Sequence, residues 1–218
     1  MKIGVLGGTG PAGRGLSARL ASVGFEVIIG SRSAERADEI AARIHTRWPD
    51  LSLDLRGAGN HEAASADVVF VATPWDAAAV TAKDCAAELD GKVVISMANA
   101  LAKVGDEFQP LVPPRGSVAA SVQAAVPNSM VAATMHHVPA KELGDLSNPV
   151  ESDVLVCSDH PEATKTTMDL VSRIPDLRAV DAGELSNAAP IEAFAAVLLG
   201  VNMKYRTRVA IRFTGLPD

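Results

Sequence analysis

A glycine cluster near the amino terminus carries the first chemistry that this sequence suggests. Gly8-x-Gly10-x-x-Gly13 follows the apolar run at residues 3–6 and precedes apolar side chains at helical spacing. Between a strand and a helix, such glycines permit a tight turn, let the backbone approach a pyrophosphate, and let the helix pack closely on the strand. The motif therefore predicts a dinucleotide site in a β-α-β unit.

The same glycines fit a second spacing. Gly7, Gly10 and Gly13 match the GxxGxxG variant of extended epimerase-type dehydrogenases, which need a Tyr-x-x-x-Lys couple for proton transfer. Tyr205 is the only tyrosine, and Arg-Thr-Arg-Val follows it. The sequence therefore lacks the catalytic couple that this alternative requires.

The residues after the second expected strand indicate which dinucleotide binds. An NAD enzyme places a carboxylate there for the ribose 2′-hydroxyl, whereas this chain has Ser31, Arg32 and, one helical turn on, Arg36. A guanidinium can fork onto a 2′-phosphate, and the serine can donate a hydroxyl. A solvated helix start is the plainer alternative, but cations there oppose the helix dipole. The pattern favours NADP over NAD.

Two adjacent histidines, His136 and His137, follow an expected strand at residues 130–135. Ligands of open α/β sheets bind at the carboxyl ends of strands. Because neighbouring strand residues point to opposite faces, we expect only one of the two to face a cleft. A structural, unreactive histidine is the alternative, and side chains that point apart do not form a metal pair. We predict no metal site.

Composition limits the function classes. The chain has 218 residues, of which 48% are hydrophobic and 21% charged, with a net charge of −6. The negative charge argues against nucleic-acid binding. Two cysteines without a C-x-x-C motif predict a reducing, cytoplasmic location. No uninterrupted apolar stretch of membrane length is present, so we predict no membrane span.

Strand and helix patterns alternate along the chain. They predict an α/β fold: a Rossmann-type doubly wound parallel sheet in residues 1–143 and a small α+β C-terminal lobe in residues 144–218. A proline-rich loop is expected at residues 109–115. Expected strands cover residues 3–6, 25–29, 51–55, 68–72, 93–96, 130–135, 153–157, 178–181 and 209–213; expected helices cover 12–23, 34–46, 77–89, 117–126, 161–174 and 190–205.

Several segments together resemble one family. GGTGPAGRGLSARLASVGFEVIIGSRSAERA, TPWDAA, VVIS, HHVPA and DAGELSN, in register over nearly the whole chain, are similar to the NADPH-dependent reductases of coenzyme F-420, an 8-hydroxy-5-deazaflavin. The resemblance implies NADP along the carboxyl ends of the strands, the deazaflavin in a cleft closed by the C-terminal lobe, and a homodimer.

The resemblance also implies roles for single residues. The pyrophosphate would lie on Thr9, Gly10, Pro11 and Ala12, within the motif of Gly8 and Gly13; the 2′-phosphate on Ser31, Arg32 and Arg36; and the ribose and nicotinamide along Trp75, Ala79, Asn99 and Ala140. Plain packing is the alternative for Trp75. Ser186 and Asn187 either cap the following helix or face the deazaflavin.

The implied reaction is hydride transfer between NADP(H) and coenzyme F-420. It requires two rings held at near-attack distance with water excluded, and no nucleophile, so we predict no catalytic side chain. Two alternatives remain. A reductase of a small imine or carbonyl would need a proton donor, and a non-enzymatic NADP(H)-sensing protein would need no second pocket.

Overall fold

The computed structural model describes residues 1–216. Eight strands form one twisted sheet in the order β10-β9-β8-β5-β4-β1-β2-β3, and β6 and β7 form a separate antiparallel hairpin. All neighbours in the large sheet are parallel except β8 and β9. The strands are β1 (Lys2–Leu6), β2 (Glu26–Ser31), β3 (Leu55–Gly59), β4 (Val68–Val71), β5 (Val93–Ser96), β6 (Leu101–Val104), β7 (Glu107–Pro110), β8 (Met130–Ala133), β9 (Ser152–Ser158) and β10 (Leu177–Asp181).

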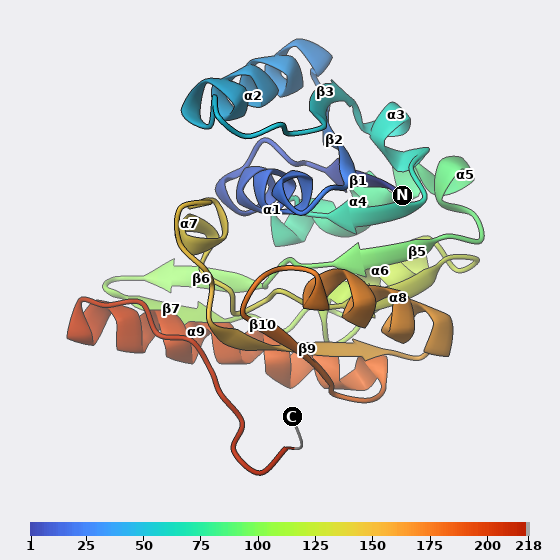
Figure 1. Ribbon diagram of the computed structural model, residues 1–218. Coiled ribbons are helices and arrows are strands. Elements are labelled where there is room, and N and C mark those ends of the chain that lie inside the picture. The colour runs from blue at the N-terminus through green and yellow to red at the C-terminus, as the bar shows by residue number, and fades with distance from the viewer. Residues whose placement is uncertain (217–218) are drawn as a thin grey trace.

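Helices cover both faces of the sheet, so the chain is a doubly wound α/β protein, as expected. Figure 1 shows α2 at one end of the molecule, α9 at the other, and α7 beside α1. The helices are α1 (Pro11–Ser22), α2 (Ala34–Arg47), α3 (Asn60–Ala64), α4 (Trp75–Asp84), α5 (Ala86–Leu89), α6 (Val118–Ala125), α7 (Ala140–Leu143), α8 (Pro161–Ser172) and α9 (Ala188–Tyr205), with the short 3₁₀ turn η1 (Leu185–Asn187) before α9.

Each central strand contributes to two hydrophobic cores. Val5 and Ile29 lie in the core beneath α1, α2 and α8, whereas Leu6 and Ile28 lie in the core on the opposite face. Alternate residues of a strand face opposite sides, and a sheet covered by helices on both sides needs apolar residues on both. This requirement explains the continuous apolar runs by which these strands were predicted.

The third strand was predicted four residues too early. The structure places β3 at Leu55–Gly59, a glycine-containing segment with low strand propensity. Its glycine is required by packing, since a Cβ on Gly57 would lie 2.2 Å from the backbone nitrogen of Asp38 in α2. A tertiary contact between backbones therefore overrides the local preference of this segment.

Two further predictions about connections were wrong. The segment predicted as a loop from residue 109 begins inside the β6–β7 hairpin, which turns at Gly105 with φ of 60°. The expected helix at residues 77–89 is divided into α4 and α5 at Cys85. Both differences lie at turns, where periodicity carries little information.

The expected last strand, residues 209–213, forms no strand. The backbone nitrogen of Asp153 donates to the carbonyl of Ile211 (2.8 Å), and the nitrogen of Phe213 donates to the Asp153 carboxylate (2.5 Å). This segment therefore lies along β9. One backbone hydrogen bond joins the two, but the second bond that a strand pair would form is replaced by the bond to the Asp153 side chain. Arg178 also donates twice to the same carboxylate, at 2.8 and 2.7 Å.

The strands after residue 143 continue the main sheet rather than forming a second one. β9 joins β8 and carries β10, and α9 packs against α6 and β7. The division at residue 143 stays a prediction. By length and composition the helix at Leu185–Tyr205 could cross a membrane, and 39% of its most apolar window is buried. Its buried Glu192 accepts from the backbone nitrogens of Val118 (2.9 Å) and Ala119 (3.1 Å), which ties the helix to α6.

We predict that Asp153→Asn lowers the free energy of unfolding at pH 7 by about 2 kcal/mol. The hydrogen bonds of Arg178 are the largest cause that lowers the pKa of Asp153, to about 2. Because this pKa is lower in the folded state, the carboxylate stabilises the fold above the unfolded value near 4 and loses that effect as pH falls toward 2. Urea titrations from pH 7 to pH 2 measure both quantities. Equal stability of the two proteins at pH 7 would contradict this account.

Candidate functional site

The glycine loop between β1 and α1 is held by backbone contacts. Gly7 makes the turn, with φ of 66°, and the nitrogen of Gly8 donates to the carbonyl of Gly30 at 2.9 Å. A Cβ on Gly13 would lie 2.7 Å from the Cα of Gly8, so this glycine lets α1 pack on the loop. At Gly10 the only protein atom within 4 Å of a Cβ would be the carbonyl oxygen of Gly7, at 3.9 Å. The loop therefore leaves open space at the amino end of α1, where a phosphate fits.

The first cavity lies over this loop and has a volume of about 640 Å³. It extends from the loop to the carboxyl end of β2 and the start of α2, as the sequence predicts for a dinucleotide. α4 forms the opposite wall. The lining residues are Gly7, Thr9, Gly10, Ser31, Arg32, Arg36, Asn60, Ala72, Thr73, Pro74, Asp76, Ala77, Val80, Thr81 and Asp84.

The cationic end of this cavity is built by the start of α2. Ser33 caps the helix, because its hydroxyl accepts from the backbone nitrogen of Arg36 (3.2 Å). The hydroxyl of Ser31 accepts from the nitrogen of Ser33 (3.3 Å). Within residues 1–216, neither Arg32 nor Arg36 forms an ion pair. Two exposed, uncompensated guanidiniums at this position suit a 2′-phosphate.

The second cavity has a volume of about 210 Å³ and lies beyond the other end of the glycine loop. Its walls come from the ends of β5 and β8, the start of α1 and one face of α9, and they are mainly apolar. The lining residues are Ala12, Met97, Asn99, Met135, His136, His137, Val138, Pro139, Ala140, Ala195, Leu198, Leu199 and Asn202.

His136 and Asn99 form a reciprocal pair in the wall of this cavity. The Asn99 amide nitrogen donates to the backbone carbonyl of His136 (2.7 Å), which turns its oxygen toward the ring Nδ1 of His136 at 3.0 Å. That nitrogen must carry the proton, since an amide oxygen only accepts. Burial lowers the pKa of His136 to about 3, so the ring is neutral and holds the Asn99 amide in one orientation.

His137 is also neutral and is held by the backbone. Its Nε2 donates to the carbonyl of Asp153 (2.8 Å), and burial is the first cause that lowers its pKa. Both histidines line the second cavity, so the expectation that only one would face a cleft was wrong. β8 ends at Ala133, and Met135 adopts φ of 63°, so strand alternation does not extend to the histidines.

The remaining predicted residues are divided between the cavities. Thr9 and Gly10 line the first, and Ala12 and Ala140 the second. Pro11 lines neither of these two. Gly8 and Gly13 line neither cavity and instead pack against each other where α1 meets the loop.

Trp75 and Ala79 share the first turns of α4, half-buried. Trp75 packs against the hydrophobic core, and neither residue lines a described cavity. Asn187 does not cap α9, because its amide donates to the carbonyl of Ala182.

Sequence reasoning missed Asn60, whose side-chain oxygen accepts from the nitrogen of Gly7 (3.3 Å) in the first cavity. It directly follows β3, so a correct placement of that strand would have indicated it. Leu198, Leu199 and Asn202 were also missed; one face of a long apolar helix gives no signal of a ligand.

α7 holds the wall of the second cavity against α1. The buried guanidinium of Arg19 donates to the carbonyls of Leu143 (3.1 Å), Glu142 (3.0 Å), Asp145 (2.6 Å) and Asn148 (3.0 Å). A Cβ on Gly15 would lie 2.8 Å from the carbonyl of Ala140. The two helices therefore touch through their backbones, and Ala140 is fixed beside the glycine loop.

Comparisons with known proteins show the family of this chain. Residues 2–100 match the family model described as "NADP oxidoreductase coenzyme F420-dependent". The F420-dependent NADP reductase of Methanocaldococcus jannaschii is 40% identical over 222 residues, 99% of each chain. That of Methanothermobacter marburgensis is 37% identical over 224 residues, 100% of each chain. The chain belongs to the F420-dependent NADP reductase family.

Solved structures support the fold of this family member. A protein from an Arthrobacter species has a TM-score of 0.81 at 24% identity, covering 98% of this chain and 100% of its own. An imine reductase from Bacillus cereus has a TM-score of 0.62 at 14% identity, covering 94% of this chain and 63% of its own. At these identities the likeness concerns the fold alone.

We predict that Gly10→Val abolishes NADPH binding and leaves the protein folded. The side chain would occupy the open space at the amino end of α1, and φ of −72° with ψ of 167° accepts any residue. Fluorescence titration measures the affinity, and thermal melting the fold. Gly13→Val is the contrasting variant, because its side chain collides with Gly8 and should unfold the protein. Unchanged NADPH affinity in Gly10→Val would refute the placement of the pyrophosphate.

Proposed function

We propose that this protein transfers a hydride between NADP(H), bound in the first cavity, and coenzyme F-420, whose deazaflavin ring enters the second. The observation that carries the proposal is the pairing of the two cavities across one loop: Thr9 and Gly10 line the first, and Ala12 the second. They also open at neighbouring strands, since Thr73 follows β4 and Asn99 follows β5. Two ligands placed there meet at the carboxyl edge of the sheet.

The cationic end of the first cavity supports NADP rather than NAD. Arg32 and Arg36 are available to a 2′-phosphate, and the hydroxyl of Ser31 lies beside them. The nearby carboxylate of Glu35 accepts from the Ser33 hydroxyl at 2.7 Å and so is engaged within its own helix turn. Arg32 and Arg36 therefore supply the positive charge that favours NADP, which carries a 2′-phosphate, over NAD, which does not.

The second cavity can orient the deazaflavin ring in an apolar environment, but it supplies no general acid or base. Both ligands carry a hydride between ring carbons when they are bound, so the chain has no bond to activate. Ala195, Leu198 and Leu199 give the cavity an apolar wall. The second N–H of Asn99, not used by His136, is free to donate to a carbonyl oxygen of a ring. These contributions are positioning and preorganised hydrogen bonding.

The neutral histidines weigh against the alternative of imine or carbonyl reduction. Such a reaction delivers a proton as well as a hydride, and its donor must titrate near the working pH. Burial holds the pKa of His136 at about 3 and also lowers that of His137. A sensing protein without enzymatic activity would have no use for the second cavity.

The same proposal includes a homodimer in the cytoplasm. The described face of α9 exposes Phe194, Val197 and Met203, an apolar stripe that a second copy of this chain would cover, as the family resemblance implies. The two cysteines are free and buried, which suits a reducing compartment.

We predict that Arg32→Ala weakens NADPH binding by about tenfold to a hundredfold and leaves NADH binding almost unchanged. A charge-assisted hydrogen bond of 1.5–3 kcal/mol would be lost only with the phosphorylated nucleotide. Arg43→Ala is the matched control, because Arg43 lies on α2, the helix that follows Arg32, is exposed, and does not line the cavity. Equal losses for both nucleotides would show that Arg32 does not contact the 2′-phosphate.

The assay of the proposed reaction follows the absorbance of oxidised coenzyme F-420 at about 420 nm. Addition of NADPH to the protein and the coenzyme should bleach this band, and NADH should do so much more slowly. Gly10→Val should be inactive. No bleaching by the wild-type protein, under conditions where NADPH binds, would remove the proposed function.

A further inference from the structure

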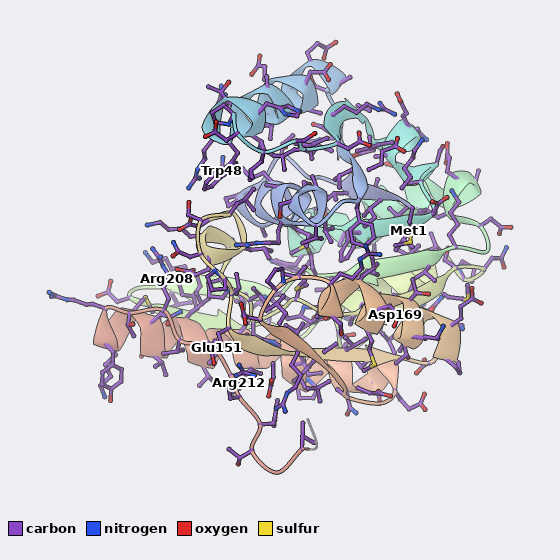
Figure 2. All side chains as sticks on the ribbon, in the orientation of Figure 1. Met1, Trp48, Glu151, Asp169, Arg208 and Arg212 are labelled. Carbon is purple, nitrogen blue, oxygen red and sulfur yellow. The ribbon has the colours of Figure 1, made fainter. Side chains whose placement is uncertain are left out.

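A third cavity, of about 370 Å³, lies on the outer side of α1. It is bounded by the first turns of α1, the carboxyl end of α2 and the start of α7. Figure 2 places Trp48 between α2 and α7, at this position. The lining residues are Pro11, Arg14, Gly15, Ala18, Ile44, Arg47, Trp48, Ala140, Lys141 and Gly144.

The charge of this cavity has one sign. Arg14, Arg47 and Lys141 line it, no carboxylate does, and none of the three forms an ion pair within residues 1–216. In a chain with a net charge of −6, three uncompensated cations around one hollow form a local anion site.

The carboxylates nearest to this cavity are already engaged. Asp145 accepts from Asn148 and from the backbone of Ser147, which lower its pKa together with smaller effects of Arg47 and Arg19. Glu142 forms an ion pair with Arg208. The field of the three cations is therefore only partly offset.

Contacts with the rest of the fold hold two of the segments around this cavity in place. The guanidinium of Arg47 lies over the ring of Trp48, 5.1 Å from its centre, and Trp48 packs against the core. Lys141 stands on α7, which the bonds of Arg19 hold against α1. The backbone positions of Arg47 and Lys141 are therefore fixed, and the stacked guanidinium of Arg47 loses less conformational freedom when an anion binds.

The third cavity adjoins the second. Ala140 lines both, and Pro11 of the third is followed by Ala12 of the second. A ligand that fills the second cavity and continues over Ala140 therefore reaches Arg14, Arg47 and Lys141. Coenzyme F-420 has such an extension, because a phosphodiester and glutamate carboxylates follow the ribityl chain of its ring.

We propose that Arg14, Arg47 and Lys141 bind the anionic tail of the deazaflavin substrate, so that this cavity is a subsite of the second substrate and not of NADP. The inference rests on the proposed function. The tail contributes phosphate and carboxylate groups, which suit two guanidiniums and an ammonium. The tail subsite would then select the complete coenzyme over its ring fragment.

The experiment compares the complete coenzyme with a fragment that ends after the ribityl chain and so lacks both phosphate and glutamates. Arg14→Gln, Arg47→Gln and Lys141→Gln, singly and combined, are assayed with each substrate. We expect KM for the complete coenzyme to rise about two- to fivefold for each exposed cation removed, and more in the triple variant. KM for the fragment, KM for NADPH and kcat should stay at wild-type values.

Arg43→Gln is the matched control, since Arg43 is an exposed cation on α2, the helix that carries Arg47, and does not line the cavity. Its KM values should equal those of the wild type. High salt should raise KM for the complete coenzyme in the wild type and have little effect in the triple variant.

The outcomes separate the explanations. A rise in KM for NADPH would assign the cavity to a phosphate of that nucleotide and overturn the proposal. Equal rises for the coenzyme and the fragment, or no rise in the triple variant, would also overturn it. If the wild-type protein reduces neither the coenzyme nor the fragment while binding NADPH, the proposed function itself fails.

Discussion

The backbone contacts of α1 with the glycine loop and with α7 determine where the walls of the three cavities lie. At its start, Gly13 lies against Gly8, and this contact keeps the amino end of the helix open beside the loop. On its outer side, Gly15 touches Ala140, and Arg19 saturates the carbonyl groups that follow α7. A buried guanidinium bonded only to carbonyls is costly to desolvate, and four hydrogen bonds offset that cost. The three cavities surround this one helix.

The electrostatics of the cavities differ in a way that matches the ligands proposed for them. The first and third present exposed cations without ion-pair partners among the described residues, where phosphates and carboxylates belong. The second is apolar, and its two histidines are neutral. Hydride transfer between two rings is favoured where water is excluded and no side chain competes for the hydride or its charge. In the proposed arrangement the charges of the protein therefore lie at the ends of the ligands and away from the reacting carbons.

Much of this arrangement could be predicted from local sequence patterns. The apolar runs of β4 and β5, the glycine spacing at the start of α1 and the serine before α2 each act through neighbours in sequence, so the strands, the loop and the cap could be predicted. The cationic pair Arg32 and Arg36 follows from its place after β2. These features suffice for the fold class and the nucleotide site.

The remainder depends on contacts between distant segments. β3 contains Gly57 because the backbone of α2 packs directly against it. The glycine lowers the strand propensity, so the strand was predicted too early. For the same reason Asn60, which follows the strand, was missed. α7 is a single turn, held by Arg19 from more than a hundred residues away. The histidines follow a left-handed residue, Met135, that no periodicity indicates. The third cavity collects cations from three helices, so no single stretch of sequence reveals it.

Whether the hydride passes directly from one ring to the other is tested by the fate of an isotope label. NADPH deuterated at the transferred position of C4 is mixed with the protein and oxidised coenzyme F-420 for a single turnover, and the reduced coenzyme is examined by mass spectrometry. The account predicts that the deuterium is recovered at C5 of the deazaflavin and not in water. Recovery of the label in the solvent would contradict it, because an exchangeable group of the protein would then have to carry the hydrogen between the two ligands.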